Sequence, residues 1–170
     1  MDGWVAQHQG EPFDRNGEWA ASGTVITTLL SALLQDPYFA TRPPKSTGPE
    51  YFHLDWLAAQ LGGKEAPADV QCTLAELTVE SLARALEEQP LDVIRVCGGG
   101  ARNVWLMQRL SDRLEGTPVT TTEDIGVDPE WVEAWAFAWL AEQTLAGLAG
   151  NVPAVTGAAG ARVLGGIYPS

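Results

Sequence analysis

The chain is poor in basic residues, in cysteines and in long apolar runs. Ten Lys and Arg stand against 22 Asp and Glu, which leaves a formal net charge of −12. A nucleic-acid-binding protein needs a basic surface to neutralise phosphates, so this charge argues against a nucleic-acid partner. No apolar run approaches the roughly 18 residues of a membrane-spanning helix, and no signal peptide opens the chain. We therefore expect a cytoplasmic protein without a membrane partner.

Cys72 and Cys97 are the only cysteines. Disulfide-dependent secreted domains carry more cysteines, so we expect both thiols to be reduced and buried. With 45% apolar and 19% charged residues, the composition is that of a globular protein. A chain of 170 residues is long enough for one sizeable core, and a single domain over residues 1–170 is expected.

Helical and strand patterns alternate in the second half of the chain. Apolar spacing and breaker residues predict helices over residues 2–9, 24–35, 50–61, 67–88 and 104–115, and a last helix that begins at Asp128-Pro129. Short apolar runs predict strands over residues 92–97 and 117–121. Strands separated by a helix favour a parallel pair with a right-handed crossover, so the predicted fold class is α/β, with helices packed on a small parallel sheet.

Three consecutive glycines, Gly98, Gly99 and Gly100, follow the first predicted strand and lead to a helix that opens near Asn103. Glycine has no Cβ, so a ligand can approach the main chain closely, and the unpaired amides at a helix start carry partial positive charge. The loop at residues 122–128 follows the second strand. Because ligands bind at the carboxyl ends of parallel strands, we expect this loop to form a crevice with the glycine turn.

Three interpretations of the glycine turn are open. A dinucleotide fingerprint would need a third glycine where Asn103 stands, and Glu123 matches the expected acid only approximately. A plain tight turn is the second interpretation. The third is a nucleotide site of the actin/hexokinase type, in which the glycine turn passes under an adenosine and a polar residue that opens the helix contacts it.

The last predicted helix is apolar almost all round, with Trp131, Trp135 and Trp139 repeating every four residues. Such a helix is expected to be buried, with its tryptophans in the core. Glu133 would then be a carboxylate on a buried helix, where it needs a partner. It forms either a structural ion pair or a favourable contact with the helix dipole, or else it faces the crevice.

Two further motifs point to structural roles. Lys45-Ser46-Thr47 superficially matches the end of a phosphate-binding P-loop, but prolines precede it, and proline has no amide to bind a phosphate. This segment is either a rigid surface loop or a loop that lends Lys45 or its hydroxyls to a cleft. His53 lies beside aromatic residues and is expected to be structural.

Motifs along the whole chain carry a resemblance to one family. They are Pro44-Lys45-Ser46-Thr47-Gly48, Phe52-x-Leu54-x-Trp56-Leu57, Cys97-Gly98-Gly99-Gly100-Ala101-x-Asn103, Thr121-Thr122-Glu123-Asp124-x-Gly126, Glu133-Ala134-x-Ala136-Phe137-Ala138-Trp139-Leu140-Ala141, Gly150-Asn151-x-Pro153-x-Val155-Thr156-Gly157-Ala158 and Leu164-Gly165-Gly166-Ile167-Tyr168-Pro169. In these motifs and in their order, the chain resembles the C-terminal part of anhydro-N-acetylmuramic acid kinase, a bacterial sugar kinase of the actin/hexokinase superfamily.

The resemblance implies a fold and an activity. The fold is the C-terminal part of an actin/hexokinase-like, ribonuclease H-like kinase domain. The activity is transfer of the γ-phosphate of ATP, with Mg²⁺, to 1,6-anhydro-N-acetylmuramic acid with hydrolytic opening of the anhydro ring. The product, N-acetylmuramic acid 6-phosphate, serves peptidoglycan recycling. By the same resemblance, Gly98, Gly99, Gly100 and Asn103 lie on the adenosine side, Glu133 lies near the anhydro sugar, and no residue is assigned to a metal.

The chain also departs from the family pattern. Family members are longer, and their Ser-Gly-Thr-Ser-x-Asp-Gly phosphate loop lies in an N-terminal domain. Their catalytic aspartate lies in a Phe-Asp-x-Gly-Pro-Gly-Asn stretch just before the segment that resembles Met1-Asp2. We therefore expect the missing N-terminal half as a partner, no kinase activity from this chain alone, and an uncovered sheet edge and apolar helix faces. A homodimer is a further possibility, and a non-catalytic nucleotide-binding or structural fragment is the alternative function.

Overall fold

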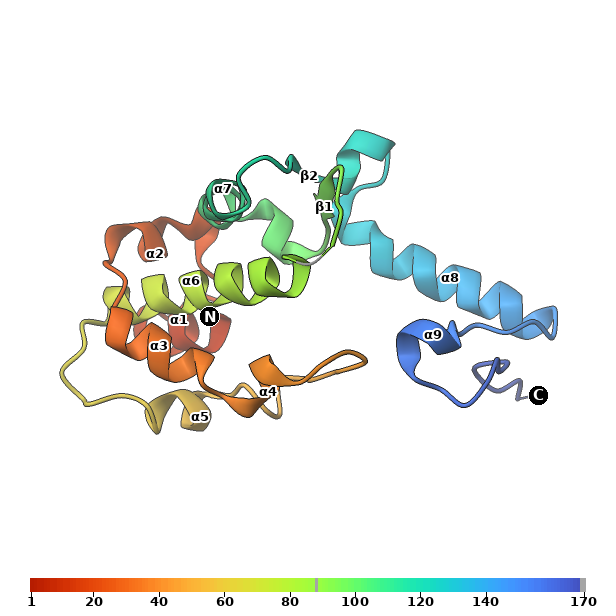
Figure 1. The fold of residues 1–170 in the computed structure, drawn as a ribbon, viewed down its shortest axis with the longest axis horizontal. Helices are drawn as coiled ribbons and strands as arrows, with labels where there is room; N and C mark the ends of the chain where they lie inside the picture. The colour runs from red at the N-terminus through yellow and green to blue at the C-terminus, as the bar shows by residue number, and fades with distance from the viewer. Residues whose placement is uncertain (88, 169–170) are drawn as a thin grey trace.

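The computed structural model of the chain describes residues 1–87 and 89–168 and is built around one long helix, α6 (Pro67–Leu86). Around it lie α1 (Asp2–Gln9), α2 (Glu18–Ser22), α3 (Thr27–Leu34), α5 (Leu54–Ala58) and α7 (Val104–Arg113), as Figure 1 shows. The core side chains come from these helices and are Trp4, Leu29, Leu33, Leu57, Val70, Leu74 and Leu77. Residues are buried on several faces of α6, because α1, α2, α3 and α7 all pack on it.

The helices predicted over residues 2–9, 67–88 and 104–115 are confirmed within a few residues at their ends. Residue 88, the last of the second of these, lies outside the described residues. The helix predicted over residues 24–35 begins later, at Thr27, because the preceding amides bond to α6. The Thr24 amide donates to Asp69 Oδ1 at 2.8 Å, and the Ile26 amide donates to Thr73 Oγ1 at 2.9 Å.

The helix predicted over residues 50–61 was too long, since α5 covers only Leu54–Ala58. His53 has an extended backbone, and its Nδ1 accepts from the Asp55 and Trp56 amides at 3.2 and 3.3 Å, so it caps the helix. The expected structural role of His53 is confirmed. The Tyr51 and Phe52 rings before it join a cluster of aromatic side chains instead of a helix.

A short helix, α4 (Pro37–Ala40), was not predicted. Asp36 follows the end of α3 and caps α4, because its carboxylate accepts from the Tyr38 amide at 2.9 Å. The same carboxylate accepts from Tyr51 Oη and Trp56 Nε1, both at 2.9 Å. Burial raises the pKa of Asp36, but the three hydrogen bonds outweigh it and bring the pKa below its usual value.

The predicted parallel sheet is confirmed and is small. Strand β1 (Ile94–Val96) pairs in parallel with β2 (Val119–Thr121), with Ile94 opposite Val119. Helix α7 connects the two strands and packs on both β2 and α6. The α/β class is therefore confirmed, with the main core between helices.

Two ion pairs fix α7 against α6. Arg109 contacts Glu76 through two hydrogen bonds of 3.0 and 3.1 Å, and Arg113 Nε donates to Glu80 Oε1 at 2.6 Å. Both glutamates are mostly buried, with side chains 10% and 19% exposed. Since the glycine turn leads directly into α7, these pairs also position that turn.

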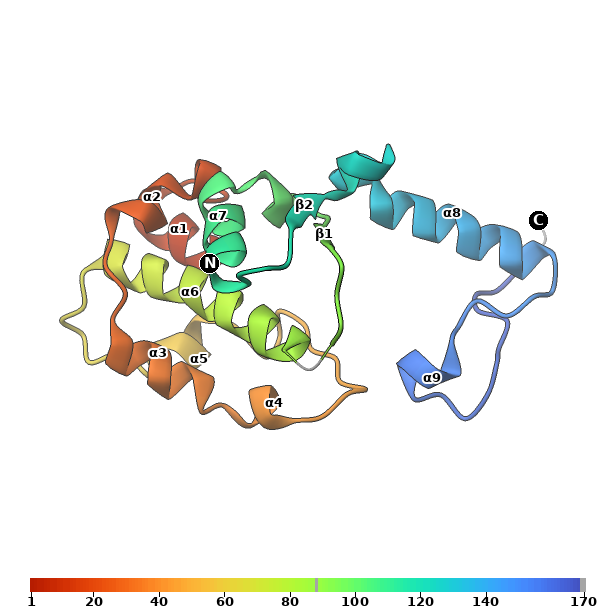
Figure 2. The same cartoon turned by 45° about the horizontal axis from the view of Figure 1, so that its top comes forward.

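The last part of the chain extends away from the helical body (Figures 1 and 2). It contains η4 (Pro129–Trp131), α8 (Val132–Leu145) and the short α9 (Pro153–Thr156). Asp128 Oδ1 accepts from the Glu130 amide at 2.9 Å, so the predicted cap is confirmed. The segment after α9 returns to the end of α8, where the Thr144 hydroxyl donates to the Leu164 carbonyl, and to the loop that follows α8, where the Arg162 carbonyl accepts from the Gly150 amide at 3.0 Å.

The prediction that the last helix is buried was wrong for this structure. No residue of α8 is buried, and Trp131, Trp135 and Trp139 are 61%, 57% and 48% exposed. Glu133 is exposed too, so the argument that it is a buried charge in need of a partner fails. An apolar helix is buried only if another surface packs on it, and the described residues cover little of this one. The expectation of uncovered apolar helix faces is confirmed.

The two cysteines differ. Cys72 is buried on α6, where burial raises the pKa of its thiol. Cys97 is exposed, so its predicted burial was wrong. It follows β1 at the edge where the strand turns outward into the glycine turn. Both are free thiols.

Candidate functional site

The glycine turn after β1 is a short loop with an open backbone. Gly98 has a φ of 79°, which side-chain-bearing residues rarely adopt, and it leads into η2 (Gly99–Arg102). A Cβ added at Gly98 or Gly99 would meet no heavy atom within 4 Å. The Gly99 and Gly100 amides begin η2 and have no partner within it. The turn therefore presents bare main chain and N–H donors to a ligand.

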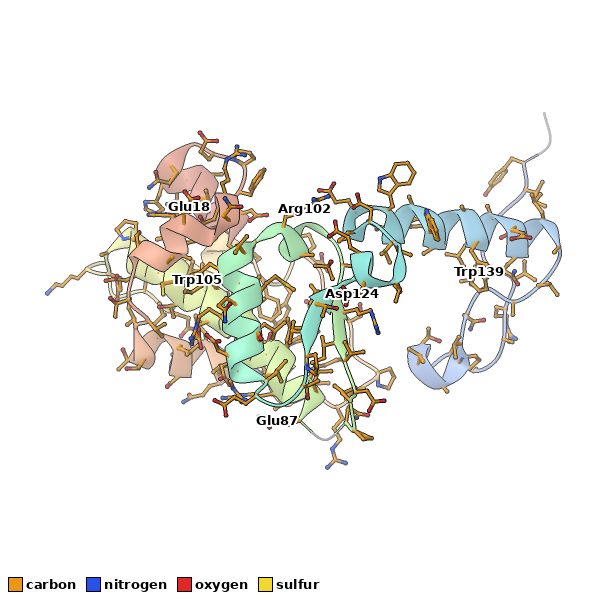
Figure 3. All side chains as sticks on the ribbon, turned by 90° about the horizontal axis from the view of Figure 1, so that it is seen from above. Glu18, Glu87, Arg102, Trp105, Asp124 and Trp139 are labelled. Carbon is orange, nitrogen blue, oxygen red and sulfur yellow. The ribbon has the colours of Figure 1, made fainter. Side chains whose placement is uncertain are left out.

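The loop after β2, which includes η3 (Thr122–Ile125), continues to η4 and holds the glycine turn in place. The Gly98 amide donates to the Pro129 carbonyl at 2.9 Å. The Arg102 guanidinium lies 3.4 Å from Asp128 Oδ1 and 3.5 Å from Glu130 Oε2. Figure 3 shows Arg102 at this junction between the helical body and α8. These contacts bring the end of the loop at residues 122–128 next to the glycine turn, as expected. The predicted crevice between the two was wrong, however, because no residue of 122–128 lines the cleft beside the glycine turn. The second wall of that cleft comes from a distant loop instead.

A cleft of about 640 Å³ opens beside the glycine turn. Gly99, Gly100 and Asn103 line one side of it. The other side is formed by loop 13–16, which includes the start of η1 (Arg15–Gly17) and lies next to α2. Met1 and Asp2, at the start of α1, also line the cleft, and burial lowers the pKa of the Met1 α-amino group.

Asp14 anchors loop 13–16 to the helical body. Its side chain is buried, and it accepts from the Trp19 and Ala20 amides at 2.9 Å each and from Gln71 Nε2 at 3.2 Å. Next to this anchor, Gly17 has a φ of 74° and packs directly on Asn103. A Cβ at position 17 would overlap Asn103 Oδ1, so the two sides of the cleft are in contact at this point.

The predicted site residues do not all lie in the cleft. Gly99, Gly100 and Asn103 line the cleft, and the Gly98 amide is used in the bond to the loop after β2. Asn103 caps α7, because its Oδ1 accepts from the Leu106 amide at 2.9 Å. The NH₂ group of Asn103 therefore remains as a donor for a ligand. Glu133 lies outside the cleft lining, on the first turn of α8.

Comparison with known proteins identifies the family. A sequence model described as anhydro-N-acetylmuramic acid kinase matches residues 1–170. The chain belongs to this family. Two relatives with that name are those of Chromohalobacter salexigens and Pseudomonas fluorescens, which are 52% and 54% identical to the chain over 99% and 100% of its length. The chain spans about half the length of these relatives, 47% and 48% respectively.

Two other motifs of the chain lie outside the cleft lining. Lys45 Nζ donates to the Tyr38 carbonyl at 3.0 Å and lies 4.6 Å from the centre of the Tyr38 ring. The ammonium group is therefore used in a contact with α4, which favours the interpretation as a rigid surface loop. Thr47 and His53 line a separate, mostly apolar cavity of about 600 Å³ between α1, α4, α5 and α6.

The sequence patterns missed loop 13–16 as a wall of the cleft. This stretch reads only as a turn, and its Asn16-Gly17 corner is confirmed with φ values of 55° and 74°. No local sequence pattern indicates that Phe13 and Arg15 lie across a cleft from the distant glycine turn. An aspartate shortly before a short helical pattern was the one available signal, because it predicts a cap.

Within residues 1–87 and 89–168, no group of three or more His, Cys, Asp and Glu side chains is placed to hold a metal ion. In the same residues, no helix is both long and apolar enough to cross a membrane.

Proposed function

We propose that this chain forms the nucleoside-binding half of the active-site cleft of an anhydro-N-acetylmuramic acid kinase. The reaction is transfer of the γ-phosphate of ATP to 1,6-anhydro-N-acetylmuramic acid, with water opening the anhydro ring, to give N-acetylmuramic acid 6-phosphate for peptidoglycan recycling. One observation carries the proposal. In a chain that matches this family over residues 1–170, the glycine turn after β1 lines a cleft of about 640 Å³.

The cleft fits the nucleoside part of ATP. The backbone at Gly99 and Gly100 is open, so a planar or ribose group can lie against it, and the Asn103 NH₂ group is a donor at the start of α7. Mg²⁺ would come with the phosphates, as is usual in phosphoryl transfer. The described residues offer no ligand cluster for it, so we assign the metal to no side chain of this chain.

The first residues of the chain lie where a preceding catalytic aspartate would be close to the nucleotide. Met1 and Asp2 line the same cleft as the glycine turn. The family resemblance implies that the catalytic aspartate comes just before the residue that Met1 matches. In the longer relatives, that aspartate would therefore lie beside the nucleotide, where a general base for the attacking hydroxyl or water is needed.

The half that the relatives possess in addition would supply the phosphate loop and the base, and it would bring a surface to α8. Glu133 would then act on the sugar side, as the resemblance implies. Phosphoryl transfer depends mainly on positioning and electrostatic stabilisation, so one wall of the cleft is not sufficient. We therefore propose that the chain alone has no kinase activity and acts together with a partner half.

A chimera tests this. The N-terminal part of the Pseudomonas fluorescens relative that the chain does not match is fused ahead of Met1, and ADP release is measured with and without anhydro sugar. We expect sugar-dependent ADP release from the chimera, none from the chain alone, and a loss in the chimera when Gly100 is changed to Val. A folded chimera without turnover would refute the proposal, and turnover by the chain alone would refute the need for the partner half.

A further inference from the structure

Resting on the proposed function, we infer that Phe13 and Arg15 form the second wall of the nucleoside pocket and select a purine base there. The two residues flank Asp14 in loop 13–16, directly across the cleft from the glycine turn. Neither belongs to a motif that the family resemblance uses. They would add a recognition element for the base to the main-chain wall formed by the glycines.

The local backbone explains why both side chains point away from the helical body, where they line this cleft and also a smaller cavity of about 260 Å³ beside Trp19. Asp14 has an extended conformation, with φ −80° and ψ 100°. In extended backbone, successive side chains point to opposite sides. Asp14 points into the helical body and is held there by three hydrogen bonds, so its two neighbours point outward. Phe13 is left 50% exposed, although burial of a phenyl ring is normally favourable.

The pair has the right chemistry for a flat, uncharged heterocycle. The Arg15 guanidinium carbon lies 5.7 Å from the centre of the Phe13 ring. An aromatic ring and a planar guanidinium are the groups on which nucleobases stack. On the opposite side, glycine backbone without Cβ atoms lets the second face of the base approach closely.

The charge of the cleft points to the base and ribose and away from the phosphates. Three cationic residues line it, which are Arg15, Arg102 and Met1 with its α-amino group, and three acidic residues line it, which are Asp2, Asp14 and Glu130. Arg102 is already paired with Glu130. These charges balance, so a triphosphate would meet no excess of positive charge here, and a neutral nucleoside needs none. Phosphate binding therefore belongs elsewhere along the cleft.

The spacing of the two walls is set by a direct contact. Gly17 packs against Asn103, and a Cβ at Gly17 would also lie 2.9 Å from Trp105 Cβ. Loop 13–16 and the start of α7 are thereby held together at one end of the cleft. A pocket with one rigid end and two flat faces is suited to a planar base.

NMR titration of the ¹⁵N-labelled chain with adenosine, cytidine and inorganic tripolyphosphate tests the inference. We expect adenosine to shift the Gly98–Gly100 amide signals and to bind more tightly than cytidine. Phe13→Ala should weaken adenosine binding about tenfold, the range measured for loss of a stacked aromatic group, and remove the preference over cytidine. Arg15→Gln should weaken it by about threefold. The response to tripolyphosphate should not change.

The controls separate this inference from the proposed function. Phe137→Ala removes an exposed phenylalanine on α8, outside the cleft, and should leave adenosine binding unchanged. Phe13→Leu keeps an apolar side chain without the ring, and it should weaken binding even if Phe13→Ala fails to fold. If Gly100→Val abolishes adenosine binding while both Phe13 variants bind normally, the inference is overturned and the proposed function stands. If adenosine leaves the glycine amides of the wild-type chain unshifted, both are overturned.

Discussion

Replacing Asp14 by alanine should destabilise the fold strongly, because this one buried carboxylate joins three parts of it. It accepts from the Trp19 and Ala20 amides at the start of α2 and from Gln71 Nε2 on α6. Gln71 is fully buried, and its Oε1 has no hydrogen-bond partner among the described residues. The substitution would leave the whole Gln71 amide without partners.

The magnitude follows from these contacts. A hydrogen bond to a charged group contributes about 1.5–3 kcal/mol, and a buried polar group left unpaired costs about 1–3 kcal/mol. The three bonds share one acceptor and do not add fully, so we expect a loss of about 3–5 kcal/mol. That is a large part of the roughly 5–15 kcal/mol of a typical domain.

Urea unfolding followed by far-ultraviolet circular dichroism measures this loss. For a urea m-value of about 1–3 kcal/mol/M, the midpoint should fall by more than about 1 M. Asp14→Asn should lose less, since its amide oxygen still accepts from α2. Asp92→Ala, at an exposed aspartate before β1, is the matched control and should change the free energy of unfolding by less than about 0.5 kcal/mol. An Asp14→Ala variant as stable as this control would refute the reasoning.

Three further changes test other parts of the structure. The hydrogen bond from Arg113 holds the pKa of Glu80 below its usual value. This carboxylate therefore stabilises the fold fully above its unfolded-state pKa, and the stabilisation is lost as the pH falls through its folded-state pKa. Glu80→Gln should therefore cost about 1–2 kcal/mol at pH 7 in urea unfolding, and the difference from wild type should shrink below about pH 4.5; a difference independent of pH would contradict this. Gly17→Ala should lower the free energy of unfolding by more than about 2 kcal/mol, because the position combines a positive φ with a steric overlap. Gly10 has a similar φ but open space around it, so Gly10→Ala is the control and should lower the free energy of unfolding by about 1 kcal/mol. Equal losses would show that the overlap does not matter. Trp135 on α8 is 57% exposed, so Trp135→Gln should change the free energy of unfolding by less than about 0.5 kcal/mol relative to wild type. The same substitution should lower the binding of a hydrophobic dye. A strong destabilisation would mean that α8 is packed in solution.

Several elements could be predicted from local patterns because their causes are local. Helix α6 has an apolar pattern and a proline at its first position, and the glycine turn has a residue that must adopt a positive φ. Asn103 and Asp128 cap their helices with their own side chains. Residues close in sequence make these interactions, so the sequence is sufficient to find them.

The errors arose where a distant group competes for the same backbone or surface. Helix α3 begins late because α6 side chains bind the Thr24 and Ile26 amides. Helix α5 begins late because His53 caps it and the aromatic residues before it pack around Asp36. These choices depend on which elements meet in space, and a pattern of apolar residues does not contain that information.

The sequence by itself determined the α/β order of elements, the open glycine turn at the end of β1 and the family to which the chain belongs. The tertiary structure alone decided that loop 13–16 faces this turn, with Gly17 against Asn103, and that α8 is exposed. The physical reason is the same in both cases. A turn or a cap depends on residues within a few positions, whereas a cleft or a buried face depends on a second surface, which only the folded chain or a partner can supply.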